Sequence, residues 1–213
     1  EDSLEVDGHR IRLSNLGKVL YPSTGTTKGD VVGYYIAIAE TMLPYCRNRP
    51  ATRKRWPDGV GADGHGDSFF QKDLGGSAPE WVRTGRMQHR DHVNTYPLVN
   101  DTATLVWLAQ LAALELHVPQ WRFDASGAPG RPDRMVFDLD PGEGVSLPSC
   151  AQVAFLVRDA LRGMGLRAVP VTSGGSGIHV YAALDGGLTS DEASDAAHEL
   201  ARSLEADHPD GIT

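Results

Sequence analysis

Two aspartates at the end of a short apolar run are the residues whose types and spacing point most directly to chemistry. Asp138 and Asp140 end the run Met135-Val136-Phe137-Asp138-Leu139-Asp140, and Pro141-Gly142 follows. Residues two apart on a strand point to the same face, so the two carboxylates are expected side by side. Such a pair is unfavourable unless a cation lies between the charges, and hard divalent cations prefer carboxylate oxygens. The pair predicts a catalytic metal site, with a surface acidic turn as the alternative.

A glycine-rich loop predicts a phosphate site. Ser173-Gly174-Gly175-Ser176-Gly177 separates two expected strands, residues 168–172 and 178–184. Backbone N–H groups in such loops can cradle phosphate oxygens, while the Ser173 hydroxyl and the His179 ring can donate further hydrogen bonds. The alternative is a hairpin turn beside a partly buried histidine. Metal carboxylates next to a phosphate cradle indicate metal-assisted phosphoryl or nucleotidyl transfer.

A basic stretch followed by two aromatic residues suggests contact with nucleic acid. Residues 50–56 read as a strand that carries Arg53, Lys54 and Arg55. These three cannot all be core, so we interpret them as phosphate ligands or solvated surface. The next expected strand, residues 68–72, contains Phe69-Phe70. Strand alternation predicts that one ring is buried and the other is exposed, where base stacking would contribute ~1–3 kcal/mol per base.

The bulk composition fits a globular protein without a membrane segment. The chain has 213 residues, 40% hydrophobic content and a net charge of −8. No apolar run approaches the roughly 18 residues that a membrane span needs, and the N-terminus shows no signal peptide. Two cysteines are too few for a disulfide framework, which favours a reducing, cytoplasmic compartment.

Charge is distributed unevenly along the chain. Residues 9–57 carry nine Lys/Arg and two acidic residues, a local charge of +7, whereas residues 185–213 carry eight acidic residues and one Arg, a local charge of −7. Binding to a polyanion depends on the local patch more than on the total charge. The N-terminal segment is therefore a candidate nucleic-acid surface, with an uneven solvated surface as the alternative.

The first 133 residues are expected to form a mixed α/β module followed by a linker. The expected elements are a hairpin over residues 4–13 around Asp7-Gly8, a helix from about Asp30 capped by Thr26 or Thr27 and closed by Pro44, a helix from Asn100 or Asp101 to about Glu115 with Leu105, Leu108, Ala112 and Leu116 as its apolar stripe, and a linker over residues 124–133. His117 is then expected just past a helix. Residues 73–95 show no regular pattern.

The remaining residues predict a β-α-β-β-α unit. Its expected elements are a strand over 134–140, a helix from about Leu147 capped by Ser146 with Val153, Leu156, Ala160 and Met164 as its buried face, strands over 168–172 and 178–184, and a last helix opened by the capping box of Thr189 and Glu192. The first and third strands are expected to be neighbours, which brings the carboxylate pair and the Ser/Gly/His loop to one cleft. Ferredoxin-like and RNA-recognition-like units have one more strand, so we expect a truncated domain.

Taken together, these segments resemble a known family. They are residues 16–22 (LGKVLYP), 27–30 (TKGD), 53–57 (RKRWP), 68–72 (SFFQK), 116–121 (LHVPQW), 137–141 (FDLDP) and 172–181 (TSGGSGIHVY). The chain resembles the polymerase domain of bacterial DNA ligase D, a branch of the archaeo-eukaryotic primase superfamily. The resemblance implies an α+β primase-polymerase fold in one domain, with an N-terminal part over residues 1–130 packed on an RNA-recognition-like catalytic part over 131–213.

The resemblance also implies a function and roles for individual residues. It implies a template-dependent nucleotidyl transferase that fills or extends broken DNA ends in non-homologous end joining, commonly prefers ribonucleotides and uses manganese, or magnesium, as two ions. The implied roles are metal ligation by Asp138 and Asp140, nucleotide contact by Lys54, His117, Ser173, Gly174 and His179, a grip on the 5′-phosphate by Lys18 and Lys28, and packing of Phe69 and Phe70 against template bases. Arg53 and Arg55 would add DNA contacts.

Partners follow from the same resemblance. The implied partners are DNA ends with a 5′-phosphate, nucleoside triphosphates, and Ku-type, ligase or nuclease proteins or domains. The implied location of the protein is the bacterial cytoplasm, at the nucleoid.

Two departures from the family pattern bear on activity. Relatives usually carry Lys or Arg where this chain has Ser176, and the family's third catalytic aspartate lies on a strand beyond Thr213. The 213-residue chain alone is therefore expected to be inactive or nearly so.

Two other readings remain open at the level of sequence. One is a non-catalytic DNA-end-binding module that kept the phosphate grip. The other is a metal-dependent phosphatase that uses the first aspartate of Asp-x-Asp as a nucleophile in a parallel sheet. In the latter class a Thr or Val usually stands two residues after the second Asp, whereas Asp140 is followed by Pro141-Gly142.

Overall fold

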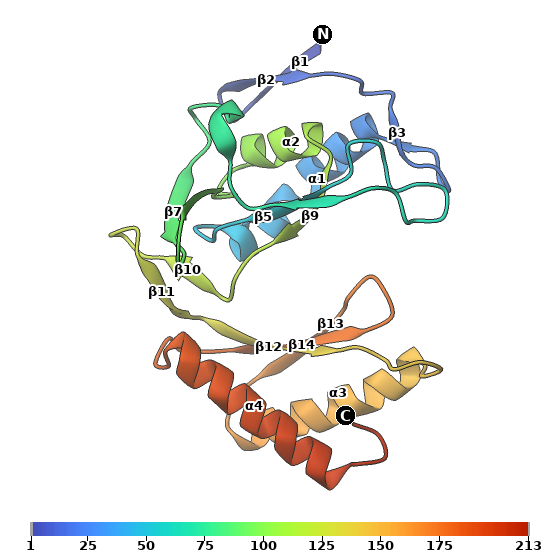
Figure 1. Cartoon of the computed structure of the whole chain (residues 1–213), viewed down its shortest axis with the longest axis vertical. Helices are drawn as coiled ribbons and strands as arrows, with labels where there is room; N and C mark the ends of the chain where they lie inside the picture. Colours follow the sequence, from blue (N-terminus) through green and yellow to red (C-terminus); the bar gives the residue numbers. More distant parts are fainter. Residues whose placement is uncertain (1, 213) are drawn as a thin grey trace. The chain divides into compact units, whose positions relative to one another are not determined.

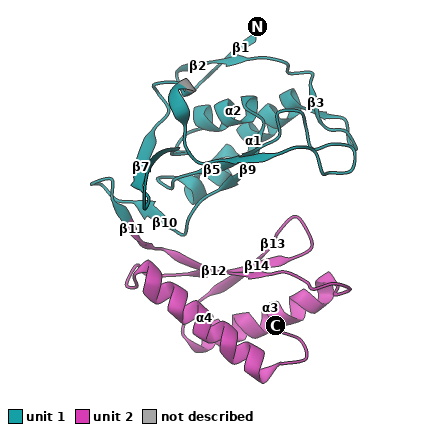
Figure 2. Cartoon of the chain, viewed as in Figure 1, with its two compact units in different colours: residues 1–129 teal, residues 130–213 magenta. Residues whose placement is uncertain are grey.

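A computed structural model describes residues 2–212 of the chain (Figure 1). The chain divides into two compact units, Glu1–Pro129 and Gly130–Thr213 (Figure 2). The division falls inside the segment 124–133, which reads as a linker in the sequence. Among the described residues, no helix is both long enough and apolar enough to cross a membrane.

The first unit combines two helices with short antiparallel ribbons and one three-stranded sheet. Its elements are β1 (Asp2–Val6), β2 (His9–Leu13), β3 (Val19–Tyr21), β4 (Thr26–Thr27), α1 (Lys28–Cys46), β5 (Thr52–Arg55), β6 (Phe69–Gln71), η1 (Gly75–Ser77), β7 (Thr84–Gln88), β8 (Val93–Pro97), α2 (Thr102–Gln110), β9 (Ala113–His117) and β10 (Trp121–Phe123), and β11 (Pro129–Pro132) crosses the boundary. The three-stranded sheet has the order β6-β5-β9. Helices α1 and α2 pack against each other and supply much of the core.

The start of helix α1 is as expected, but its end is not. Thr27 caps the helix, and the Asp30 side chain reaches back to the Thr27 N–H in a capping box. The expectation that Pro44 closes the helix is wrong, because α1 continues to Cys46. A proline so near the C-terminus removes one N–H bond from the last turns and leaves the rest of the helix intact. The hairpin around Asp7-Gly8 is confirmed as β1–β2.

Helix α2 is shorter than the sequence pattern indicates. The expectation of a helix to about Glu115 is wrong, because α2 ends at Gln110 and residues 113–117 form strand β9. Ala112 has a left-handed φ of 53°, which ends the helical path. The following residues then pair with β5, and this tertiary pairing outweighs their helical spacing.

A β-hairpin lies where the sequence shows no regular pattern. Strands β7 and β8 pair antiparallel, with Gly85 opposite Tyr96. A side chain at Gly85 would run into the Phe123 ring of β10. The hairpin packs this closely because position 85 has no Cβ.

The second unit is a three-stranded antiparallel sheet with two helices. Its elements are β12 (Arg134–Leu139), α3 (Leu147–Gly163), β13 (Ala168–Thr172), β14 (Ile178–Ala183) and α4 (Ser190–Asp207), and the strand order is β12-β14-β13. Both helices pack on the sheet, as Figure 1 shows. The core takes Met135 and Phe137 from β12 and Ile178, Val180 and Ala182 from β14.

The β-α-β-β-α order and the pairing of the first strand with the third are confirmed. The capping box of Thr189 and Glu192 is also confirmed. The buried face expected for α3 is wrong by one position: Cys150, Ala154, Val157 and Leu161 are buried, while Met164 is 54% exposed. Two apolar stripes overlap on this helix, about 100° apart, and packing on the sheet selects one.

Candidate functional site

Asp138 and His179 form the centre of the candidate site in the second unit. They are direct partners across β12 and β14, so the strand register alone brings them together. His179 Nε2 lies 3.2 Å from Asp138 Oδ1, and the side chains are 30% and 61% exposed, respectively. Both residues point away from the face that packs on α3 and α4, because their neighbours Phe137 and Val180 fill that core.

Asp140 lies just past the end of β12 and is exposed. A Cβ on Gly177 would stand 2.9 Å from Asp140 Oδ1 and 2.5 Å from the Leu139 carbonyl oxygen. The absence of a side chain at Gly177 therefore gives this carboxylate its place beside the glycine loop. That proximity brings the acidic strand end and the loop together, as the sequence predicts.

Carboxylate oxygens suit a hard divalent cation, so the donor set fits such an ion in type. Among residues 2–212, however, no group of three or more His, Cys, Asp or Glu side chains is arranged to hold a metal. The described residues thus supply two carboxylates and a neighbouring imidazole, rather than a complete ligand set.

The glycine loop is built around Ser173. Its Oγ accepts hydrogen bonds from the N–H groups of Gly175 (3.3 Å) and Gly177 (3.1 Å), and its own N–H donates to the Gly177 carbonyl (3.1 Å). Gly174 has a φ of 86°, which favours glycine. Two of the loop N–H groups therefore point inward, which leaves the Ser173 O–H and the N–H groups of Gly174 and Ser176 as the candidate phosphate donors.

A second cluster of charged and aromatic residues lies on the sheet β6-β5-β9 of the first unit. Phe70, Lys54 and Glu115 are direct partners across its three strands. Lys54 Nζ lies 3.6 Å from Glu115 Oε1, and His117 Nε2 lies 2.9 Å from Glu115 Oε2. The Phe70 and His117 rings meet edge to face at 5.4 Å.

Glu115 does not stand out in the sequence, because the segment from Asn100 or Asp101 to about Glu115 reads as one helix. The signal that favours a strand is the alternation in Leu114-Glu115-Leu116-His117, which has period two rather than 3.6. The interpretation of His117 as following a helix is wrong for the same reason, since it is the last residue of β9.

Phe69 and Phe70 are both exposed, by 46% and 59%, so the expectation of one buried ring is wrong. They lie on β6, an edge strand, and neither ring is covered by the core. Each ring lies close to a cation: the Arg55 guanidinium is 5.3 Å from the Phe69 ring, and Lys54 Nζ is 5.5 Å from the Phe70 ring. Two aromatic rings with flanking cations remain accessible to a ligand.

Arg53 is a structural residue, and the interpretation of it as a phosphate ligand or solvated side chain is wrong. It is 1% exposed, and its Nη2 donates to the Asp73 carbonyl at 2.7 Å. Burial lowers the pKa of Arg53 to about 10. Arg55 is half-buried and donates to the Leu111 carbonyl and to Gln71 Oε1, at 2.9 and 3.0 Å. It remains a candidate through its position over Phe69.

Lys18 and Lys28 lie at one end of the β3–β4 ribbon, where the Lys28 N–H donates to the Lys18 carbonyl. The Lys18 ammonium pairs with Asp58 at 2.6 Å, and the Lys28 ammonium donates to the Ser14 carbonyl at 3.1 Å. Lys28 is 7% exposed, and burial, followed by the nearby charges of Lys18 and Arg55, lowers its pKa. Two neighbouring ammonium groups favour an anion between them.

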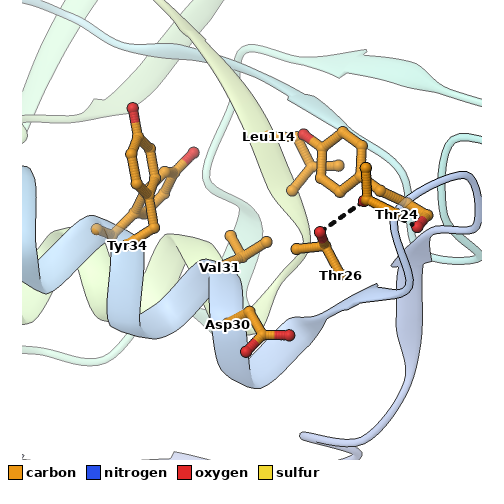
Figure 3. Close-up of a pocket in the computed structure, with 8 residues that line it drawn as sticks. Thr24, Thr26, Asp30, Val31, Tyr34 and Leu114 are labelled. Carbon is orange, nitrogen blue, oxygen red and sulfur yellow. Dashed lines mark hydrogen bonds between the residues drawn. The ribbon is translucent and has the colours of Figure 1, made fainter.

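Among the described residues, two surface cavities in the first unit are large enough to consider. One, of about 440 Å³, is lined by Tyr21, Thr24, Thr26, Asp30, Val31, Tyr34, Tyr35 and Leu114, and contains none of the predicted site residues. In Figure 3 the Thr24 and Thr26 hydroxyls face each other at its rim, 2.7 Å apart. The other cavity, of about 370 Å³, borders His117, with Lys72, His89, Tyr96 and Trp121 among its walls. It extends the charged and aromatic surface around His117.

Comparison with known proteins identifies the family. A family model of the LigD primase-polymerase domain matches residues 27–213. The chain belongs to this family. Divalent metal ions are implied for the LigD polymerase family as a whole. The antiparallel order β12-β14-β13 also argues against the phosphatase reading, which requires a parallel sheet.

LigD relatives in four bacterial genera include two at 49% and 30% identity. The chain is 49% identical over 209 residues to "Multifunctional non-homologous end joining DNA repair protein LigD" of Mycobacterium tuberculosis, covering 96% of this chain and 27% of that protein. It is 30% identical over 172 residues to "Bifunctional non-homologous end joining protein LigD" of Bacillus subtilis, covering 81% and 26%. The chain thus spans about a quarter of the length of these relatives.

A solved LigD structure shares the fold. "Polymerase Domain from Mycobacterium tuberculosis Ligase D in complex with DNA" matches with a TM-score of 0.89 and 49% identity, covering 94% of this chain and 70% of that one. The similarity supports the α+β fold with small antiparallel sheets, and four α-helices occur in the described part of this chain.

Proposed function

We propose that this chain is the polymerase part of a LigD-type end-joining protein that adds nucleotides, ribonucleotides in particular, to DNA ends under the direction of a template. The observation that carries the proposal is the opposition of Asp138 and His179 across β12 and β14, beside the glycine loop. An acidic strand end next to phosphate donors suits phosphoryl chemistry. Membership of the LigD family supports the same reaction class.

Asp138 and Asp140 are the residues proposed to hold manganese or magnesium. Divalent ions bound there would neutralise phosphate charge and activate the attacking hydroxyl. The protein residues around them have separate tasks. His179, oriented by its contact with Asp138, and the loop donors Ser173 and Gly174 would hold phosphate oxygens of the nucleotide.

In the first unit, Lys54 and His117 are proposed to contact the incoming nucleotide. The Lys54 ammonium offers a point charge for phosphate, and the His117 ring offers a hydrogen bond. Both are accessible, with side-chain exposures of 27% and 52%.

DNA contact is proposed for a separate set of residues in the first unit. Lys18 and Lys28 would bind the 5′-phosphate of a break, and Phe69, Phe70 and Arg55 would contact template bases and backbone. Support comes from the exposed rings and from the DNA complex of the mycobacterial relative. Ku-type, ligase and nuclease partners and a place at the nucleoid remain predictions from the family.

Primer extension tests the proposal. The substrate is a DNA end with a recessed 3′-hydroxyl and a 5′-phosphate, supplied with Mn²⁺ and either ribo- or deoxyribonucleotides. We expect weak template-directed extension by the 213-residue chain, and we expect it to fall at least 100-fold in Asp138→Asn and in Asp140→Asn, because each change removes a carboxylate ligand. Glu199→Gln, an exposed carboxylate on α4, is the matched control. Extension that survives both aspartate changes would contradict the proposal.

A non-catalytic DNA-end-binding module is the second candidate. Two points favour it: Ser176 stands where the family resemblance implies a basic residue, and the described residues hold no group of three metal-ligating side chains. DNA binding that is unchanged in Asp138→Asn, with no nucleotide incorporation by the parent protein, would select this candidate.

A further inference from the structure

Glu115 lies between two side chains that the proposed function assigns to the nucleotide. Its carboxylate oxygens are divided between them: Oε1 is 3.6 Å from Lys54 Nζ, and Oε2 is 2.9 Å from His117 Nε2. An acidic residue in this place is unexpected beside a binder of triphosphate, because it repels the ligand. We therefore look to the contacts of Glu115 with Lys54 and His117 for its role.

The sheet register fixes this arrangement. Lys54 and Glu115 are opposite partners on β5 and β9, and His117 follows two residues later on the same face of β9. Phe70 is the partner of Lys54 on the other side. The three polar groups therefore meet on one face of a three-stranded sheet without help from a loop.

The contact with Glu115 determines how the His117 ring is presented. An ionised carboxylate can only accept hydrogen bonds, so the proton of a neutral His117 ring lies on Nε2. Nδ1 is then left for a ligand, and among the described residues no hydrogen bond to Nδ1 occurs. Phe70 restricts the ring from another side, through the edge-to-face contact at 5.4 Å.

Lys54 is restrained in the same way. Its ammonium lies 4.7 Å from the centre of the Trp56 ring and 5.5 Å from that of Phe70, with Glu115 completing the set. A flexible lysine side chain loses rotamer freedom when it binds a phosphate. Restraint before binding removes part of that loss.

We infer that Glu115 is a positioning residue for nucleotide binding: it holds the His117 ring in one tautomer and orientation and restrains the Lys54 ammonium. This inference rests on the proposed function, because it takes Lys54 and His117 as nucleotide contacts. It assigns a role to an acidic residue that touches no phosphate itself.

The direction of the change in nucleotide affinity on removal of Glu115 distinguishes a positioning role from a purely electrostatic one. Removing a negative charge next to Lys54 would strengthen the attraction for a triphosphate if charge alone mattered. Loss of positioning does the opposite, since both contacts must then be ordered by the ligand. The two explanations predict changes of opposite direction in nucleotide affinity.

The experiment measures ATP binding to the whole chain by calorimetry with Mn²⁺, and KM and kcat for ATP in extension opposite a template thymine. Glu115→Ala is expected to weaken ATP binding and raise KM about tenfold, with kcat changed less than threefold. Glu115→Gln keeps an acceptor for His117 and is expected to restore most of that loss. Glu40→Gln, an exposed carboxylate on α1, is the control.

A double-mutant cycle tests whether Glu115 affects ATP binding through His117. When His117→Ala is already present, Glu115→Ala is expected to weaken ATP binding by less than threefold, because its main partner is gone. Thermal unfolding of each variant shows whether the fold is retained. If Glu115→Ala does not fold, Glu115→Thr serves in its place, because threonine favours a strand and carries no carboxylate.

Tighter or unchanged ATP binding in Glu115→Ala would overturn the inference, as would losses that add fully with His117→Ala. If the unsubstituted chain neither binds ATP nor extends a primer, the proposed function fails first. Binding by the unsubstituted chain with no loss in Glu115→Ala would refute the positioning role alone.

Discussion

Neighbouring residues on one short strand have opposite roles in this protein. Arg53 is buried with its guanidinium on the Asp73 carbonyl, whereas Lys54 faces solvent beside Phe70 and Glu115. In sequence both are basic residues of the same motif. The two differ only in the face of β5 from which the side chain projects. Arg53 is therefore a structural residue, and Lys54 is a candidate contact for a ligand.

The exposed rings on β6 lead to a prediction about single-stranded DNA. Phe69→Ala and Phe70→Ala are each expected to weaken binding to a 3′-overhang by ~1–3 kcal/mol, because each removes a surface on which a base can stack. Fluorescence anisotropy with a labelled overhang measures the effect. Phe155→Ala is the control, since Phe155 is 56% exposed on α3 and lies 4.7 Å from the Arg158 guanidinium. Equal losses for all three variants would contradict a specific role of β6.

At the scale of residues, the sequence locates most of the site but not its contacts. Asp138 and His179 are predictable because strand alternation and a β-α-β-β order bring them to one edge. Glu115 and the burial of Arg53 are not, since both depend on which strand lies beside β5. Long-range pairing is invisible to local periodicity.

Among the elements, the β7–β8 hairpin depends on the absence of a side chain at one position. Gly85→Ala is expected to destabilise the protein by about 1–3 kcal/mol, because the new methyl group meets the Phe123 ring and forces repacking. Denaturant unfolding measures the change. Gly33→Ala in α1 is the control; it has open space around it and is expected to stabilise by about 0.5–1 kcal/mol. A neutral Gly85→Ala would show that the hairpin moves freely away from β10.

The capping box of α1 gives a prediction for pH. Hydrogen bonds from the Thr27 backbone N–H and hydroxyl lower the pKa of Asp30 below its ordinary value of 3.8. A carboxylate with a depressed folded-state pKa stabilises the fold above its unfolded pKa, and the benefit is lost as pH falls through the folded pKa. Asp30→Asn is therefore expected to lower the melting temperature at pH 7.

The difference in melting temperature between Asp30→Asn and the unsubstituted chain should shrink as pH falls below the ordinary carboxyl pKa and through the depressed folded-state pKa of Asp30. Melting curves from pH 7 to pH 2.5 check this. Gly33→Ala on the same helix changes no ionisable group, so it serves as the control whose effect should be the same at every pH. A constant difference at every pH would mean that the Asp30 carboxylate charge is not involved.

Elements are predictable where local signals agree. The two capping boxes locate the starts of α1 and α4, and Asp7-Gly8 locates the first hairpin. The end of α2 is not predictable by such means, because no glycine or proline marks it and a left-handed Ala112 makes the turn. Residues 84–97 form a hairpin that packs against Phe123, a contact that no local pattern indicates.

At the scale of the whole molecule, charge is segregated along the chain. The basic excess lies in residues 9–57 of the first unit, and the acidic excess lies in residues 185–213 of the second. A polyanion is attracted to the one and repelled by the other. The total of −8 therefore says little about DNA binding, which the local excess predicts better.

The dependence of DNA binding on salt tests this view. Lys18→Ala is expected to weaken binding to a 5′-phosphorylated duplex end and to reduce the slope of log K against log salt by about 1, because one phosphate contact is lost. Glu199→Gln on α4 should leave the slope unchanged. Anisotropy titrations between 50 and about 300 mM salt measure both. An unchanged slope in Lys18→Ala would remove Lys18 from the DNA contacts.

The irregular pairing of β9 with β5 has a consequence for how this family can vary. Lys54 lies opposite Glu115 but Arg55 lies opposite Ala113, so Leu114 is the extra residue of a bulge. Leu114 instead lines the cavity beside Tyr21 and Tyr35. Deleting this one residue would leave the composition and charge almost unchanged, yet would disrupt the local alignment between the strands. We expect relatives to tolerate insertions and deletions in the loop of residues 58–67 and not in residues 111–117.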